Sequence, residues 1–284
     1  MATVPVIAPS VGRGAAAAAA TRDRLHRGPL RWVVLALTVL VALVMMSPFV
    51  IMLLNAFKSP AEYSSAGPLT LPTTLYTDGL VNFWERVDYP GKLANSVIIS
   101  GAVAILATVV SLFNAFALGI GRVKGRMWIV TLFLLANMLP QEALIYPLYF
   151  LAKEVGLYNT QLSVIIIFTV IQSAFGTYLL ASVLSTFPPS VLEAAALDGA
   201  NSWQVLWKVV FPITRPTLSV LVIFFFIWTW NEFFIPLVML IDNATQTIPV
   251  ALASLQGDRL MDAPTINAGS LISLLPAVVF FLIF

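Results

Sequence analysis

The chain has 284 residues, of which 60% are hydrophobic and 10% are charged, with a mean hydropathy of +0.94 and a formal net charge of +2. A water-soluble domain cannot have this composition, so the sequence predicts a polytopic membrane protein. No cysteine is present, which excludes disulfides and thiolate metal sites within the chain.

Six apolar runs are long enough to cross the hydrocarbon core of a bilayer, which is about 30 Å thick and takes about 20 helical residues. They span Trp32–Asn55, Leu93–Gly119, Met127–Leu151, Leu162–Leu184, Leu218–Ile241 and Thr265–Phe284. Because each run is continuous and long, the sequence predicts an all-α protein with six transmembrane helices and excludes a barrel of short alternating strands. We expect a disordered tail over residues 1–28 and a membrane domain over residues 29–284.

Basic residues are distributed unevenly between the two sides of these spans. With a cytoplasmic N-terminus, the inner segments hold Arg13, Arg22, Arg24, Arg27, Arg31, Arg122, Lys124, Arg126, Lys208 and Arg215. The outer loops then hold Lys58, Arg86, Lys92, Lys153 and Arg259. The positive-inside rule therefore predicts that the N-terminus is cytoplasmic.

The first outer loop, residues 57–92, contains four prolines that prevent a long regular helix through its first half. Its second half, Val81–Val87, is predicted to form a short helix at the membrane interface. The loop can contact an extracytoplasmic partner or cap the ends of the spans, and both interpretations stay open. The next inner turn, Gly121–Arg126, is basic and glycine-rich but does not have the spacing of a phosphate-binding loop, which occurs nowhere in the chain. Any ATP must therefore be bound and hydrolysed by another chain.

The third span is interrupted by the polar residues Asn137, Gln141 and Glu142 and by Pro140. An ionised carboxylate in the middle of the membrane costs about 2.5 to 3.5 kcal/mol on insertion scales, so Glu142 should face a partner, a cavity or the interface. The prolines predict a kinked helix whose freed carbonyls can be hydrated by a cavity. The polar residues either line a translocation path or form a packing cluster between helices.

The segment 187–216 lies between the fourth and fifth spans and mixes polar with apolar residues. Pro189 ends the preceding helix, and Ser190 with Glu193 predicts a capping box that begins a short helix. That helix should end near Asp198, because Gly199 can adopt a positive φ.

A second short helix is expected after this turn. Asn201 or Ser202 can cap it, and Pro212 is predicted to close it. Its apolar stripe, suited to the membrane interface, is Trp203, Leu206, Trp207 and Val210.

The fifth span carries Trp228, Trp230, Asn231 and Glu232 before Pro236. Amide and carboxylate groups offer hydrogen-bond donors and acceptors, and indole faces suit the apolar faces of sugar rings. These residues can line a cavity or gate, or they can form an interhelical hydrogen bond and an interfacial aromatic belt.

Three motifs together resemble the carbohydrate-importing, maltose-type family of ABC importer permeases. The central one is the EAA loop, with Glu193-Ala194-Ala195, Asp198-Gly199 and Pro212 in order. Upstream stand Pro147-Leu148-Tyr149 and Gly156–Thr160, and downstream stand Trp230–Phe233 and Pro236-Leu237. The resemblance covers roughly the last two-thirds of the chain, and we refer to residues 187–216 as the EAA-like loop.

The resemblance implies a transport subunit, not an enzyme, in the bacterial inner membrane. Its implied partners are membrane lipid, a second permease, two copies of a cytoplasmic ATPase and an extracytoplasmic sugar-binding protein, without nucleic acid. No cofactor or metal is expected on this chain, because ATP and Mg belong to the ATPase.

Candidate residues are assigned to three roles, by this resemblance and, for Asn137, Gln141 and Glu142, by their polarity within a span. The ATPase-coupling residues are Glu193, Ala194, Ala195, Asp198, Gly199 and Pro212. The residues of the substrate path or gate are Asn137, Gln141, Glu142, Trp230, Asn231 and Glu232. The binding-protein contact, in an outer loop over residues 242–264, is Gln256, Gly257, Asp258 and Arg259.

Two other classes of protein are compatible with the intramembrane carboxylates. Glu142 and Glu232 could act as the acid and base of a membrane-embedded enzyme, or they could carry protons in an ion-coupled secondary transporter. Neither class gives the EAA-like loop a purpose, so the sequence favours the importer. Because no lysine or arginine is expected inside the membrane, a neutral sugar is favoured over a phosphorylated substrate.

Overall fold

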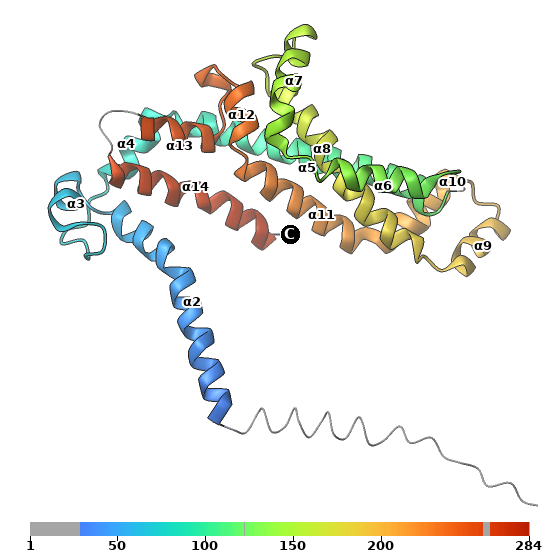
Figure 1. Cartoon of the computed structure of the whole chain (residues 1–284), viewed down its shortest axis with the longest axis horizontal. Helices are drawn as coiled ribbons and strands as arrows, with labels where there is room; N and C mark the ends of the chain where they lie inside the picture. The colour runs from blue at the N-terminus through green and yellow to red at the C-terminus, as the bar shows by residue number, and fades with distance from the viewer. Residues whose placement is uncertain (1–28, 122, 258–261, 284) are drawn as a thin grey trace, which may run out of the picture.

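The computed structural model describes residues 29–121, 123–257 and 262–283, and this part of the chain is helical throughout (Figure 1). The predicted disordered tail, residues 1–28, lies outside the described residues. The first half of the structure comprises α2 (Pro29–Ala56), α3 (Pro60–Ala66), α4 (Asp78–Arg86), α5 (Tyr89–Gly119), α6 (Arg126–Ala136), α7 (Gln141–Glu154) and α8 (Gln161–Ser185). The second half comprises α9 (Pro189–Leu197), α10 (Ser202–Gln204), the π-helix η1 (Val205–Val210), α11 (Phe211–Asn231), α12 (Phe234–Met239), the 3-10 helix η2 (Asn243–Thr245), α13 (Ile248–Gly257) and α14 (Ala263–Ile283).

Five helical segments in the described residues are long and apolar enough to span a membrane, and there are six spans if α6 and α7 count as one. The single kinked helix predicted over Met127–Leu151 is wrong, because α6 and α7 meet at an angle of 95°. Pro140 explains the break: it has an extended backbone before α7, and the residue before a proline is disfavoured in the α conformation.

The core of the bundle is formed by α5, α8 and α11, which run side by side (Figure 1). Small residues let α5 and α8 approach closely, as in other membrane bundles. Gly176 of α8 faces Ser111 of α5, and a Cβ at Gly176 would lie 2.9 Å from Phe225 of α11. Ser111 also donates hydrogen bonds to the carbonyls of Ala107 at 2.6 Å and Ser173 at 3.2 Å.

Helix α2 has a different environment, although its hydropathy is the highest of the spans. It packs against α14 and then diverges from the bundle (Figure 1). None of its most apolar 18-residue window is buried within the chain. Hydropathy therefore predicts that α2 spans the membrane, but it does not predict whether lipid or protein surrounds the helix.

The fifth span begins and ends earlier than predicted. A continuous helix runs from Ser202 to Asn231 through α10, η1 and α11, and the chain leaves it at Glu232, which is extended. Pro212 therefore lies in the first turn of α11 and does not close a helix, contrary to the prediction. The π-helix before it explains the difference, because a wider turn relieves the clash between a proline ring and the preceding carbonyl.

The outer segments are more helical than predicted. Helix α4 confirms the short helix expected near Val81–Val87 but begins three residues earlier, at Asp78. Lys92 belongs to the buried first turn of α5 and not to a loop. The loop expected over residues 242–264 contains η2 and α13.

Candidate functional site

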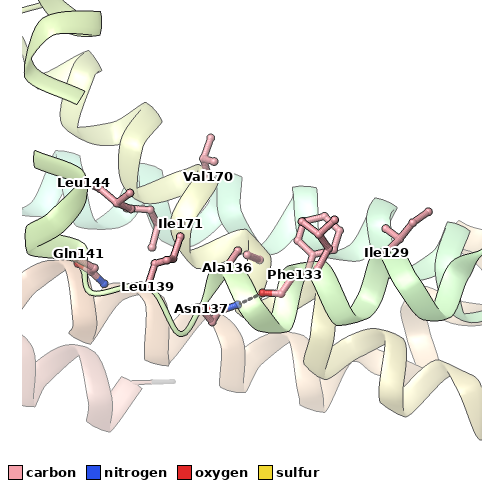
Figure 2. Close-up of a pocket in the computed structure, with 11 residues that line it drawn as sticks. Ile129, Phe133, Ala136, Asn137, Leu139, Gln141, Leu144, Val170 and Ile171 are labelled. Atoms are coloured by element: carbon pink, nitrogen blue, oxygen red, sulfur yellow. Dashed lines mark hydrogen bonds between the residues drawn. The ribbon is translucent and has the colours of Figure 1, made fainter. Parts of the chain in front are cut away.

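The break between α6 and α7 carries two of the predicted path residues. Asn137 follows α6, and its Nδ2 donates a hydrogen bond to the carbonyl of Phe133 at 2.8 Å (Figure 2). Gln141 begins α7 on the other side of the break. Because one N–H of Asn137 Nδ2 is already used by its own helix, the second N–H and the Oδ1 are left to meet a ligand.

A polar cavity of about 240 Å³ lies beside this break. Asn137 and Gln141 line it together with Asn231 and Glu232, which follow each other at the end of α11. Two groups of polar residues about 90 residues apart in the sequence are thereby brought to one cavity. The Nδ2 of Asn231 donates one N–H to the carbonyl of Ile227 at 2.8 Å, so its second N–H and its Oδ1 are left for a ligand.

An apolar cavity of about 410 Å³ lies on the α6 side of the break. It is lined by α6, α8 and the first turn of α7, and Figure 2 shows Leu144, Ile171 and Val170 gathered around it. Asn137 and Gln141 belong to both linings. The broken helix therefore separates an apolar space from a polar one.

Gln172 of α8 lines the polar cavity and was missed by the sequence analysis. Its Nε2 donates to the Oγ1 of Thr229 at 2.8 Å, which orients the amide. Its Oε1 is buried and accepts no hydrogen bond within the described structure. Buried polar atoms are nearly always partnered, so this oxygen is suited to receive a hydroxyl from a ligand or water. A glutamine in the middle of an apolar span was the available signal.

Two tryptophans near the end of α11 have different surroundings. Trp228 lines the polar cavity, is 42% exposed, and meets Phe175 in a T-shaped contact with ring centroids 5.1 Å apart. Trp230 is 4% exposed and stacks on Phe226, which stacks on Phe280 of α14. The ring of Trp230 therefore packs in the core and does not line the polar cavity, whereas Trp228 does, and the assignment of Trp230 to the path stays a prediction.

The two carboxylates of this region do not share the cavity. Glu232 lines it, whereas Glu142 is exposed in the first turn of α7 and is not among the lining residues. Within the described residues, no group of three or more metal-ligating side chains is found. The arrangement offers hydrogen bonds and aromatic faces around a cavity whose lining includes the carboxylate of Glu232.

The first helix of the EAA-like loop begins without the predicted capping box. Ser190 lies inside α9, whose N-cap is Pro188, and no side chain caps the helix. Pro189 is the first residue of α9 and has no backbone N–H, so one of the groups that a cap would satisfy is absent. The predicted end of this helix is confirmed, since α9 ends at Leu197 and Gly199 has a φ of +73°.

The surface of α9 is mostly open. Glu193 and Ala194 are exposed, and Leu197 is 89% exposed, whereas Ala195 is buried. Asp198 and Gly199 are exposed in the turn. The loop therefore exposes two carboxylates, those of Glu193 and Asp198, together with the apolar side chain of Leu197.

The second helix of this loop starts with the predicted Asn201 cap. Asn201 and Gln204 form a reciprocal capping box, with two hydrogen bonds of 2.9 Å. Its tryptophans rest on α5, because Trp203 stacks on Phe113 and Trp207 meets the same ring edge-on. Trp203 is nevertheless 61% exposed, so the expected placement of this stripe in the membrane interface stays a prediction.

The opposite end of the bundle holds the predicted binding-protein contact. Gln256 and Gly257 end α13, and Asp258 and Arg259 lie outside the described residues. The connection that leads into α13 is firmly held, because Lys92 donates to the backbone carbonyl and Oδ1 of Asn243.

A bundle of membrane helices with a broken helix, a polar cavity and an exposed helical loop at one end defines a membrane transport subunit. The chain belongs to the family described as "binding-protein-dependent transport system inner membrane component", whose model matches residues 114–284. It is therefore a multi-pass inner-membrane permease subunit of an ABC importer and not an enzyme. Permease subunits of this family bind no cofactor. Membership also decides against the ion-coupled and enzymatic alternatives.

Similar proteins are found among curated sequences and solved structures. The lactose transport system permease protein LacG of Rhizobium radiobacter is 29% identical over 242 residues, covering 85% of this chain and 87% of the relative. The trehalose transport system permease protein SugB of Mycobacterium tuberculosis is 28% identical over 216 residues, covering 75% and 79%. A bacterial ABC transporter that imports the acidic polysaccharide alginate contains a chain with the same fold, with a TM-score of 0.76, 19% identity and coverage of 97% and 98%.

Proposed function

We propose that this chain is the permease subunit of a binding-protein-dependent ABC importer of sugars and that its polar cavity is part of the sugar path. The observation that carries the path assignment is the buried Oε1 of Gln172, which has no partner within the described structure and lines a cavity of amide groups. Relatives named for lactose and trehalose transport support the substrate class.

The lining of the cavity favours a neutral sugar. Amide groups on Asn137, Gln141 and Gln172 match sugar hydroxyls, which both donate and accept hydrogen bonds. Trp228 and Phe175 offer apolar ring faces. Glu232 is the charged group of the lining, so an anionic sugar would meet repulsion and no cation.

Coupling to ATP is assigned to the exposed surface of α9. Glu193 and Leu197 point away from the bundle and fit a cleft on a cytoplasmic ATPase, with the carboxylate meeting a basic residue there. Counting α6 and α7 as one broken span gives six spans, with the N-terminus and the EAA-like loop both cytoplasmic. The end of α13 then lies outside, where it would contact the sugar-binding protein.

The transport cycle follows from these placements. Two ATPase copies close around ATP, the docked α9 moves with them, and the attached α8 and α11 shift relative to a second permease. Because α8 and α11 also line the polar cavity, the same movement changes which side of the membrane the cavity faces.

The variant Gln172→Leu tests the assignment of the path. It removes an amide that lines the cavity, so sugar uptake by the assembled transporter in proteoliposomes should fall about two- to tenfold, the value of one hydrogen bond. Thr169→Val is the matched control, since Thr169 is also a buried, unpartnered polar group on α8 but lies outside the cavity lining. Equal uptake by both variants and the natural protein would remove Gln172 from the path.

A further inference from the structure

A third cavity lies between α5 and α11, nearer the end of the bundle that carries α9, with a volume of about 240 Å³. Phe211, Arg215 and Leu218 of α11 line it, and they recur on one stripe of the helix. Since successive helical residues are rotated by about 100°, this stripe is roughly opposite Ile227 and Asn231, which line the polar cavity. The third cavity is therefore separate from the proposed sugar path.

Two polar atoms of this cavity have no hydrogen-bond partner within the described structure. They are the hydroxyl of Thr108, a residue that is 7% exposed, and the indole Nε1 of Trp207. Buried donors without partners are rare and costly, so each needs an acceptor that the described residues do not supply. Both would be satisfied by oxygen atoms of a ligand.

A cation stands at the rim of the same cavity. Arg215 is exposed, and its guanidinium lies over the ring of Phe211, 5.4 Å from the centroid. No carboxylate is among the described residues that line the cavity. The rim therefore attracts an anion.

The walls are apolar, because Val109 and Leu112 of α5 face Leu218 and Val222 of α11. A small hydrated anion or a sugar would leave these walls uncovered, whereas an acyl chain would cover them. Arg215 is the last charged residue before Glu232 along the helix Ser202–Asn231, so it marks the end of the uncharged stretch, at the level where lipid headgroups meet the hydrocarbon. Basic side chains at this level, next to a gap between helices, are suited to anionic lipid headgroups.

We propose that the cavity between α5 and α11 binds one anionic phospholipid. Its phosphate meets Arg215, its ester and phosphate oxygens accept hydrogen bonds from Trp207 and Thr108, and one acyl chain covers the apolar walls. The lipid would thereby contact η1, which joins the EAA-like loop to α11.

Native mass spectrometry of the assembled transporter in mild detergent tests this site. The transporter is incubated separately with phosphatidylglycerol, phosphatidylcholine and inorganic phosphate. We expect retention of one phosphatidylglycerol per copy of this chain, weaker retention of phosphatidylcholine and no competition by inorganic phosphate. Equal retention of the two lipids would overturn the role of the headgroup charge, and competition by phosphate would assign a free-anion site instead.

Three variants locate the binding. Arg215→Gln should weaken retention of phosphatidylglycerol about fivefold, the effect of one basic residue near the membrane surface. Ser219→Phe, which fills the cavity, should abolish it, and Arg126→Gln, a charge-matched change at the start of α6, should leave it unchanged. If the Arg215→Gln variant fails to assemble, Thr108→Val tests the site instead, because valine has nearly the same shape as threonine and lacks its hydroxyl. Unchanged retention in both Thr108→Val and Ser219→Phe would refute the site.

Discussion

The EAA-like loop and the polar cavity are held together in different ways. The turn of the loop uses contacts between near neighbours, namely the capping box of Asn201 and Gln204 and the hydrogen bond of 3.0 Å from the Ala200 N–H to the Ala195 carbonyl, and only its second helix packs on α5. The cavity instead combines residues from the α6–α7 break, α8 and α11, which are far apart in the sequence. The first helix of the loop is an exposed surface, whereas the cavity exists only when the bundle is packed.

This difference predicts that changes in the two regions have different consequences. A substitution on the exposed face of α9 should leave the fold intact and interrupt transport. A substitution near the cavity should affect either the sugar or the fold, according to the side of the helix on which it lies.

The largest effect is expected for Glu193→Arg. Glu193 is exposed on α9, so reversing its charge should abolish docking on the ATPase without disturbing the packing of the chain. Uptake in proteoliposomes should fall to background while membrane insertion and the amount of folded protein are retained. Glu154→Arg, the same charge reversal on an exposed residue at the end of α7, should leave docking intact. Normal uptake by Glu193→Arg would contradict the assignment of the docking surface.

The second prediction compares two tryptophans of α11, one that packs in the core and one that lines the cavity. Trp230→Ala removes a buried ring that stacks on Phe226, so it should lower the free energy of unfolding by about 3 to 5 kcal/mol. Trp228→Ala removes a half-exposed ring beside the cavity and should reduce sugar uptake more than stability. Thermal unfolding of the purified protein and uptake are measured for both. The same loss of stability in the two variants would erase the distinction between cavity and core.

The smallest effect concerns the loop alone. Asn201→Ala removes the side-chain oxygen that accepts from the Gln204 N–H and keeps the backbone N–H that donates to Gln204 Oε1, and the loss of the cap should cost about 1 kcal/mol. Hydrogen exchange of the backbone amides at residues 202–204 should become faster, while exchange in α8 stays the same. Faster exchange in α8 as well would show that the loop is not stabilised locally.

The features that the sequence predicted well are the ones set by local chemistry. The apolar runs located the spans, the positive φ of Gly199 was expected, and Asn201 was recognised as a cap. The EAA-like loop could be recognised as similar to that of ABC importer permeases because its motif residues lie close together in the sequence. The predicted cap at Ser190 was wrong because Pro189 begins α9 one residue earlier, so that Ser190 falls inside the helix.

The features that could not be predicted depend on packing between helices. Hydropathy alone does not say whether Trp228 or Trp230 faces a cavity, because both lie in one apolar run and only the neighbours differ. Gln172 was overlooked because its importance comes from Thr229 and from the unpartnered state of its Oε1. The angle of 95° between α6 and α7 likewise needs the whole bundle.

The π-helix η1 also sets the phase of everything that follows it in α11. A π-turn holds one residue more than an α-turn, and one residue rotates the rest of a helix by about 100°. Restoring α-helical geometry over Val205–Val210 without deleting a residue would rotate Trp228 and Asn231 by about 100° away from the cavity, although they lie about 27 to 32 Å further along the helix axis. Deleting one residue at the same time would restore their orientation. The composition of the cavity wall is therefore encoded partly by residue count in a segment that never touches it.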